Sequence, residues 1–239
     1  VKPIVSSMDH KRAKDNDQGL NTGGMGTIAP NPYYTDAIAE ECMKTIFLPT
    51  IAAMNAEGRT FKGCLYFGLM LTPNGPKVIE YNCRFGDPET QVVLPRLKTD
   101  LFTIMRAVRD EKLSDLTIEW DEGAAACVVL ASGGYPKKYE SGFEIKGLDE
   151  TGSHEGVIVY HAGTKCTDGK FYTAGGRVLG ITVQTLDAKQ AYQYNMTPGV
   201  YISDITVDTM KPPEGVPDSN DEYVNPEKFG GKTLQIYGC

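Results

Sequence analysis

Residues 77–89 read Lys77-Val78-Ile79-Glu80-Tyr81-Asn82-Cys83-Arg84-Phe85-Gly86-Asp87-Pro88-Glu89. On a strand, alternate side chains share a face, so Glu80, Asn82 and Arg84 point the same way. A carboxylate beside an amide oxygen makes an oxygen-only site suited to Mg²⁺ that carries nucleotide phosphates. The planar fork of Arg84 suits a carboxylate or a phosphate. The alternation taken alone fits a solvated edge strand equally well.

Helices and strands are predicted on both sides of this stretch. Strands over 61–71 and 77–84 flank a turn at 72–76, and helices cover 35–56 and 101–113. The helical spacing of apolar residues and the Pro-Asn-Gly-Pro turn carry these predictions.

The helix ends have their own signals. Thr35 is the predicted cap of helix 35–56, and Pro49 should kink that helix or split it in two. A further helix is expected to begin with Asp87 as its cap and Pro88 as its first residue.

The first 32 residues predict a strand over 1–8 and then a polar, glycine-rich loop to Pro32. The loop contains Asp9-His10-Lys11-Arg12 and Asn21-Thr22-Gly23-Gly24-Met25-Gly26. Two cations that lead into glycines offer charge and backbone N–H groups that can approach an anion closely. Glycine-rich turns are common, so the loop alone is weak support for a binding site.

From Trp120 onward the pattern becomes mostly β. Strands are expected over 124–131, 157–164 and 175–183, with a turn at 133–136 and a hairpin around 167–170. A closing helix is predicted to begin at 187–192, and a domain boundary near 114–122. Residues 211–228 contain several prolines and acids without periodicity, which predicts an irregular path after a strand that ends near Val207.

Composition excludes several classes of protein. The 239 residues are 41% hydrophobic with a net charge of −7, which suits a globular chain and argues against nucleic-acid or membrane-surface partners. Six cysteines without a C-x-x-C pair indicate reduced thiols and a cytoplasmic location. The sequence has no segment of membrane-spanning length and no signal peptide. Because it opens on a strand-like run without Met, we expect a piece of a longer chain.

The string at 77–89 closely resembles the metal-binding strand and following turn of ATP-grasp ligases. Among these, Arg-Phe-Gly-Asp-Pro-Glu-Thr-Gln at 84–91 is most similar to the phosphoribosylamine–glycine ligase family. Other segments match that family in order and spacing over about residues 1–192: Asp9–Arg12, Asn21–Gly26, Gly68–Met70, Gly133–Pro136, His161–Thr164 and Gly175–Leu179. After Tyr192 the family pattern ends and the sequence diverges.

The resemblance implies an α+β fold. Residues 1–115 would form the second lobe of an ATP-grasp domain, an antiparallel sheet with helices. Residues 120–192 would form a small, mostly-β carboxy-terminal α/β domain, and 193–239 a divergent tail. The amino-terminal domains of such an enzyme would be missing, so the chain alone is expected to be inactive or nearly so.

The resemblance also implies a reaction of de novo purine biosynthesis. ATP phosphorylates glycine, and the amine of 5-phosphoribosylamine attacks the glycyl phosphate to give glycinamide ribonucleotide, ADP and phosphate. The cofactors would be ATP and Mg²⁺ or Mn²⁺, with Glu80 and Asn82 as metal ligands. Arg84, Asp87 and Lys11 would be catalytic, with Glu80 and Asn82 facing a cleft that also receives Lys11. Substrate or phosphate binding would fall to Asp9, Thr22, Gly23, Gly24, Met25, Gly26 and Glu89.

Alternatives remain open at this stage. Another ATP-grasp carboxylate–amine ligase or a biotin-carboxylase-like carboxylase is one alternative. The metal-binding strands of these enzymes share Glu-x-Asn, but residues 21–26 and 133–136 fit them less well. A nucleotide-binding module that has lost catalysis is the alternative from another class. His10 and His161 are interpreted as structural rather than as acid–base groups.

Overall fold

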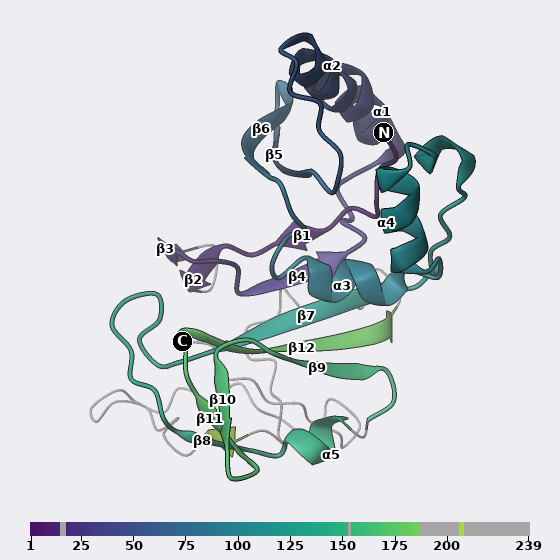
Figure 1. Ribbon diagram of the computed structural model, residues 1–239. Coiled ribbons are helices and arrows are strands. Elements are labelled where there is room, and N and C mark those ends of the chain that lie inside the picture. The colour runs from purple at the N-terminus through teal and green to yellow at the C-terminus, as the bar shows by residue number, and fades with distance from the viewer. Residues whose placement is uncertain (15–17, 153, 187–205, 208–239) are drawn as a thin grey trace.

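The computed structural model describes residues 1–14, 18–152, 154–186 and 206–207. The fold is α+β, with antiparallel sheets and a few helices (Figure 1). The helix predicted to begin at 187–192 and the irregular path predicted for 211–228 lie outside the described residues. Of the strand expected to end near Val207, only β13 (Thr206–Val207) is described.

A long helical segment covers one end of the molecule. It runs through α1 (Asp36–Cys42), the π-helical turn η1 (Met43–Phe47) and α2 (Leu48–Ala56). The side chain of Thr35 accepts a backbone hydrogen bond from the first turn, which confirms the predicted cap. Pro49 lacks an N–H and crowds the preceding turn, and the wider π turn that precedes it interrupts the α geometry without ending the helix.

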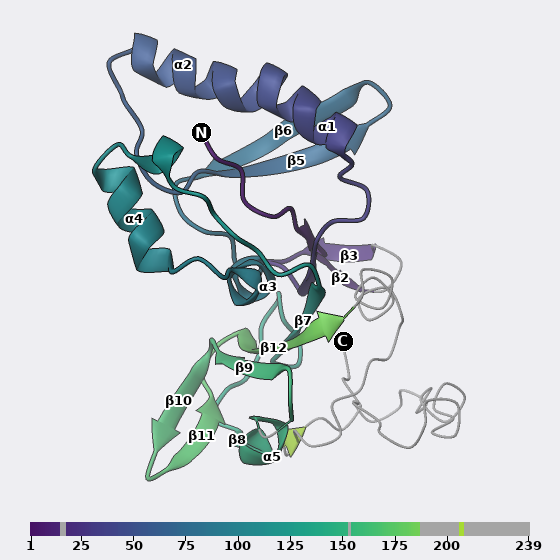
Figure 2. The same cartoon turned by 90° about the vertical axis from the view of Figure 1, so that its right-hand side faces the viewer.

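Beneath this helical segment lies the hairpin of β5 (Tyr66–Thr72) and β6 (Gly75–Asn82), as Figure 2 shows. The first strand is shorter than predicted and the second has the predicted length but begins two residues earlier, while the hairpin and its turn are confirmed. One face of the hairpin packs on the helices, and the cluster includes Cys42, Ile46, Phe47, Phe67, Leu69 and Val78. The other face is left for polar side chains, because neighbouring residues of a strand alternate between faces.

The central sheet has five strands in the order β1-β4-β7-β12-β9, all antiparallel. The strands are β1 (Met8–Asp9), β4 (Gly26–Ala29), β7 (Ala124–Ala131), β12 (Arg177–Leu186) and β9 (Val157–His161). Strand β7 has the bounds that its apolar run predicted. The hydrogen bonds between β4 and β7 join chain segments on either side of the boundary predicted near 114–122, and the division into domains stays a proposal.

The prediction for the first 32 residues was wrong in two respects. Residues 1–7 form no strand, and the strand there is confined to Met8–Asp9. The expected loop contains the hairpin of β2 (Arg12–Lys14) and β3 (Gln18–Asn21), followed by β4. Glycines and polar residues hid the hairpin strands, and β4, which pairs with the long apolar β7, is buried along its whole length.

The central sheet has apolar side chains packed on both faces. On one face, α3 (Thr90–Val93) buries Val92 and Val93 against Ala29, Ala125 and Cys127. The opposite cluster contains Leu130, Ile145, Val178, Leu179 and Ile181. The expected helix start at Pro88 was wrong, because α3 begins at Thr90. The Asp87 carboxylate accepts hydrogen bonds from the side chains of Gln91 and Arg177.

The remaining elements surround these layers. A four-stranded sheet has the order β10-β11-β8-β13, and the turn at Asp168-Gly169 confirms the predicted hairpin. The strand expected over 157–164 is split between β9 and β10. The other bounds are η2 (Leu94–Arg96), α4 (Leu101–Arg109), η3 (Leu113–Asp115), β8 (Glu144–Lys146), α5 (Leu148–Gly152), β10 (Thr164–Thr167) and β11 (Lys170–Thr173). Within the described part of the chain, none of the helices has both the length and the apolar character needed to cross a membrane.

Candidate active site

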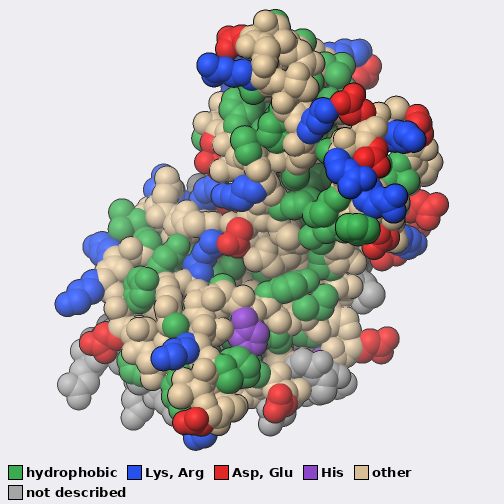
Figure 3. Space-filling model, in the orientation of Figure 1, with side chains coloured by type: hydrophobic (Ala, Val, Ile, Leu, Met, Phe, Trp, Pro, Cys, Tyr) green, Lys and Arg blue, Asp and Glu red, His purple; other side chains and the backbone are tan. Residues whose placement is uncertain are grey.

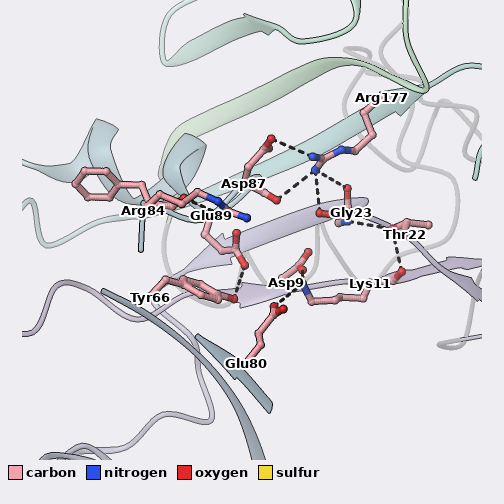
Figure 4. Close-up of polar contacts among 12 residues, drawn as sticks. Asp9, Lys11, Thr22, Gly23, Tyr66, Glu80, Arg84, Asp87, Glu89 and Arg177 are labelled. Atoms are coloured by element: carbon pink, nitrogen blue, oxygen red, sulfur yellow. Dashed lines mark hydrogen bonds and ion pairs between the residues drawn. The ribbon is translucent and has the colours of Figure 1, made fainter. Parts of the chain in front are cut away.

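The candidate site lies where the hairpin β5–β6 approaches the central sheet. Figure 3 shows the surface hollowed between the upper unit of α1, α2, β5 and β6 and the sheet below, with basic and acidic side chains meeting there. Figure 4 shows that these side chains come from β1, the chain beside β2, β6, the turn before α3 and β12. Segments far apart in the sequence therefore contribute to one site.

Lys11 links the central sheet to the hairpin. Its Nζ lies 3.1 Å from Oδ2 of Asp9 and 3.5 Å from Oε1 of Glu80 (Figure 4). The Asp9 side chain is only 6% exposed, whereas that of Glu80 is 44% exposed. The prediction that Glu80 faces Lys11 is confirmed by this ion pair.

The pKa values follow from this arrangement. Burial, and then repulsion from Glu89, raises the pKa of Asp9 to about 6, while Lys11 acts in the opposite direction. Burial alone would lower the pKa of Lys11, but the neighbouring carboxylates of Asp9, Glu80 and Glu89 outweigh it and raise that pKa. Lys11 therefore stays protonated at neutral pH.

Gly68 gives the Glu80 side chain its path toward Lys11. The two residues are paired across β5 and β6, and a β-carbon added to Gly68 would lie 2.7 Å from Cγ of Glu80. Asn82 follows Glu80 by two positions on β6, so its side chain shares the same face. A glycine is therefore needed at position 68, because a larger side chain would collide with Glu80.

Glu89 is a buried carboxylate at the back of the site. It is 5% exposed and accepts a hydrogen bond from the Tyr66 hydroxyl at 2.7 Å. Burial and the charge of Glu89 raise the pKa of Tyr66, so the phenol remains a donor. A β-carbon on Gly86 would lie 2.4 Å from Oε2 of Glu89, so the turn fits this carboxylate only with glycine there.

The glycine-rich loop at 22–26 is held by its own backbone. The sequence suggested that its N–H groups approach an anion, but in this structure those at 22–25 already donate to protein acceptors. The acceptors are O of Lys11 for Thr22 (2.7 Å), the Tyr135 hydroxyl for Gly23 (3.0 Å), Oγ1 of Thr22 for Gly24 (3.0 Å) and O of His10 for Met25 (2.8 Å). The positive groups near the loop are side chains, Lys11 and Arg177.

Gly24 shows why the loop needs glycine. Its φ is +113°, a region that other residues rarely adopt, and an added β-carbon would lie 2.3 Å from Cδ of Pro88. The loop is therefore packed directly on the turn that carries Asp87 and Glu89.

Arg177 is a residue that sequence reasoning did not assign to the site. It begins β12, and its guanidinium donates to O of Gly23 at 2.9 Å and to Oδ2 of Asp87 at 2.9 Å. The signal was present, because Gly175-Gly176-Arg177 belongs to the segments that resemble the ligase family. Sequence spacing gave no hint that this arginine meets Asp87.

The predicted site residue Arg84 and the histidine interpreted as structural, His161, make other contacts. Arg84 is exposed and donates to O of its neighbour Phe85 at 2.8 Å. His161 lies on β9, where Nδ1 is 2.9 Å from Oγ1 of Thr164 and the ring is 4.5 Å from that of Phe171. The contacts of His161 agree with a structural interpretation.

Two side chains on β6, those of Glu80 and Asn82, offer oxygen atoms that could bind a metal ion. Among the described residues no group of three or more His, Cys, Asp and Glu side chains is arranged to hold a metal ion. Glu80 and Asn82 offer oxygen ligands on one face of β6. Mg²⁺ commonly takes one or two carboxylates and completes its shell with substrate phosphates and water, which this pair permits.

Comparison with known proteins agrees with the geometry. Residues 1–90 match the family model "Phosphoribosylglycinamide synthetase, ATP-grasp (A) domain" and residues 125–205 match "Phosphoribosylglycinamide synthetase, C domain". The chain is 49% identical over 191 residues to phosphoribosylamine–glycine ligase of Caldanaerobacter subterraneus, covering 80% of this chain and 45% of that protein. It is 47% identical over 194 residues to the trifunctional purine biosynthetic protein adenosine-3 of Gallus gallus, covering 81% and 19%.

The fold is similar to two solved structures of other proteins. Phosphoribosylamine–glycine ligase of Thermotoga maritima matches with a TM-score of 0.68 and 32% identity, over 86% of this chain and 49% of that chain. Phosphoribosylglycinamide synthetase of Anaerococcus prevotii matches in fold alone, with a TM-score of 0.55 and 14% identity, over 84% and 48%. The chain thus spans about half the length of the ligases it matches. Since the two family models together cover most of its residues, the chain belongs to the phosphoribosylglycinamide synthetase family.

Proposed function

We propose that this chain is part of an ATP-dependent ligase that joins glycine to 5-phosphoribosylamine through glycyl phosphate. The curated relatives bear the name of this enzyme, and one matching family model is an ATP-grasp domain. The chain covers 45% of the Caldanaerobacter relative. The proposal therefore includes amino-terminal domains beyond this chain. It also includes a cytoplasmic location for the whole protein, which the six cysteines without a C-x-x-C pair favour.

The observation that carries the proposal is the Lys11 ammonium held between the carboxylates of Asp9 and Glu80. Phosphoryl transfer to a carboxylate requires positioned positive charge, since the reacting groups are anions. A protonated Lys11, 45% exposed, can meet such an anion while Asp9 and Glu80 fix its position. No covalent protein nucleophile is needed.

Glu80 and Asn82 would hold Mg²⁺ or Mn²⁺ in this proposal. The metal, when bound, supplies positive charge that offsets the phosphates of ATP. Lys11, whose ammonium lies 3.5 Å from Oε1 of Glu80, would orient the anion, and Glu89 is fixed by its hydrogen bond from Tyr66. Arg84 and Asp87 orient substrate groups, with the exposed Arg84 fork suited to a carboxylate.

The test uses this chain completed with the amino-terminal half of the Caldanaerobacter ligase. ADP should form only when glycine, 5-phosphoribosylamine and Mg²⁺ are all present. Lys11→Met should abolish most of the activity, while Lys14→Met, which alters an exposed lysine of β2, should not. ATP binding without any ligation would support the non-catalytic module, and ligation of a different carboxylate would indicate another ATP-grasp enzyme.

A further inference from the structure

Arg177 connects segments that are far apart in the sequence. Its Nη1 donates to O of Gly23 at 2.9 Å and to O of Asp87 at 3.3 Å, and a longer contact reaches O of Gly24 at 3.4 Å. Its Nη2 donates to Oδ2 of Asp87 at 2.9 Å. One guanidinium thus holds the glycine-rich loop and the Asp87 turn together (Figure 4).

The surroundings are shaped to this guanidinium. A β-carbon on Gly23 would lie 3.0 Å from Cζ of Arg177. A β-carbon on Gly176 would lie 2.3 Å from the ring of Tyr135, whose hydroxyl accepts the N–H of Gly23. Glycine at both positions lets Arg177 and Tyr135 reach the loop from the β7–β12 side.

The loop in turn fixes Lys11. Both the N–H and the hydroxyl of Thr22 donate to O of Lys11, at 2.7 and 2.9 Å. The N–H of Met25 donates to O of His10, and the N–H of His10 to O of Gly26. Displacing the loop would therefore displace the backbone of Lys11, and with it the ammonium beside Glu80.

We infer that Arg177 is a positioning residue of the proposed site, which sets the place of Lys11 and Asp87 without touching the reacting atoms itself. This inference rests on the proposed function. The inference requires the planar guanidinium group of arginine, whose N–H donors point in fixed directions. A lysine ammonium is a compact charge and cannot hydrogen-bond to both the Gly23 carbonyl and the Asp87 carboxylate in this geometry. The strand β12 anchors the fork, since Arg177 is paired with Ala131 of β7 in the central sheet.

The first experiment measures amide hydrogen exchange in the 239-residue chain and does not depend on ligase activity. In Arg177→Ala, the N–H groups of Gly23 and Gly24 should exchange about tenfold to a hundredfold faster, the effect of losing charge-assisted hydrogen bonds. The amides of β7 should be unchanged. Added guanidinium ion should restore the protection, and Arg109→Ala, which alters an exposed arginine paired with its neighbour Asp110, is the matched control.

Two outcomes of this experiment would overturn the inference. If the Gly23 and Gly24 amides of Arg177→Ala exchange at the wild-type rate, Arg177 does not hold the glycine-rich loop in place. If the amides of β7 also exchange faster, the substitution has lowered the stability of the whole fold. Should Arg177→Ala not fold, Arg177→Lys keeps the charge and stem and gives the same comparison.

The second experiment uses the completed ligase. Arg177→Lys should lower kcat by about tenfold or more with the KM for ATP near the wild-type value, since Lys11 is misplaced but nucleotide contacts remain. A raised KM with an unchanged kcat would make Arg177 a nucleotide-binding group instead and overturn the inference. If the wild-type completed protein has no ligase activity, the proposed function fails, and hydrogen exchange still decides whether Arg177 positions the loop.

Discussion

Lys11 and Glu80 form an ion pair across the junction of the central sheet and the β5–β6 hairpin, with Nζ 3.5 Å from Oε1. Lys11 follows the edge strand β1, and Glu80 lies near the end of β6. The pair ties the hairpin to the sheet at the point where the proposed chemistry occurs. Because both side chains are nearly half exposed, the pair itself adds little to stability, and its importance is in the placement of charge.

Glu80→Gln in the completed ligase should reduce turnover by about a hundredfold, the scale for losing one preorganised electrostatic group. Added Mg²⁺ should recover part of the loss if the defect is in metal affinity. Steady-state ADP formation at several Mg²⁺ concentrations measures both effects. Glu40→Gln, on an exposed face of α1, is the control, and wild-type rates at ordinary Mg²⁺ would exclude Glu80 as a ligand.

Gly68→Ala should impair the site more than the fold. The new β-carbon would lie 2.7 Å from Cγ of Glu80, so the exposed Glu80 side chain must turn away from Lys11. We expect a loss of ligase activity of at least about tenfold, with little change in the melting temperature. Gly133→Ala is the matched control, because a β-carbon there meets no atom within 4 Å. Equal activity of the two variants would contradict this account of Gly68.

Asp9 should make the stability of the fold fall as the pH rises. Burial and repulsion from Glu89 raise its pKa from 3.8 to about 6. Between these values the folded chain binds more protons than the unfolded chain, so the free energy of unfolding decreases with rising pH. Above that window the ionised carboxylate costs about 1–3 kcal/mol. Asp9→Asn should therefore be more stable than wild type at about pH 7.5, and the gain should shrink as the pH falls toward about 4.

Urea unfolding of both proteins across this pH range measures the difference for Asp9. Asp168→Asn, in the exposed turn between β10 and β11, controls for the loss of one acidic side chain. A stability difference for Asp9→Asn that is the same at every pH would show that the carboxylate does not titrate within the window.

Because the central sheet contains strands from both sides of residues 115–120, we expect these two parts of the chain to unfold together. Ile28 of β4 and Leu179 of β12 are each 1% exposed, and both strands are hydrogen-bonded to β7. Ile28→Ala and Leu179→Ala should each lower the free energy of unfolding by about 2–5 kcal/mol. We expect both to shift the midpoint of one cooperative transition in urea. Two transitions, each moved by only one variant, would instead support independently stable domains at 1–115 and 120–192.

The sequence by itself determined the elements whose signals are local. The apolar run 124–131 is a strand over the whole of that range, Thr35 caps its helix, and the hairpin β5–β6 turns where Pro and Gly predicted. The face shared by Glu80 and Asn82 follows from strand periodicity alone. These features depend on neighbouring residues, and short-range sterics and hydrogen bonding decide them.

Only the tertiary structure decided the features that depend on partners distant in the sequence. The strands β1 to β4 are only two to four residues long, too short for a clear alternation, and β4 is hydrogen-bonded to β7. Arg177 belongs to the site because β12 lies in the central sheet and directs its side chain to Gly23 and Asp87. The high pKa of Asp9 comes from burial that no local pattern reports. Long-range packing sets each of these, since the energy of a buried or paired polar group depends on what surrounds it in space.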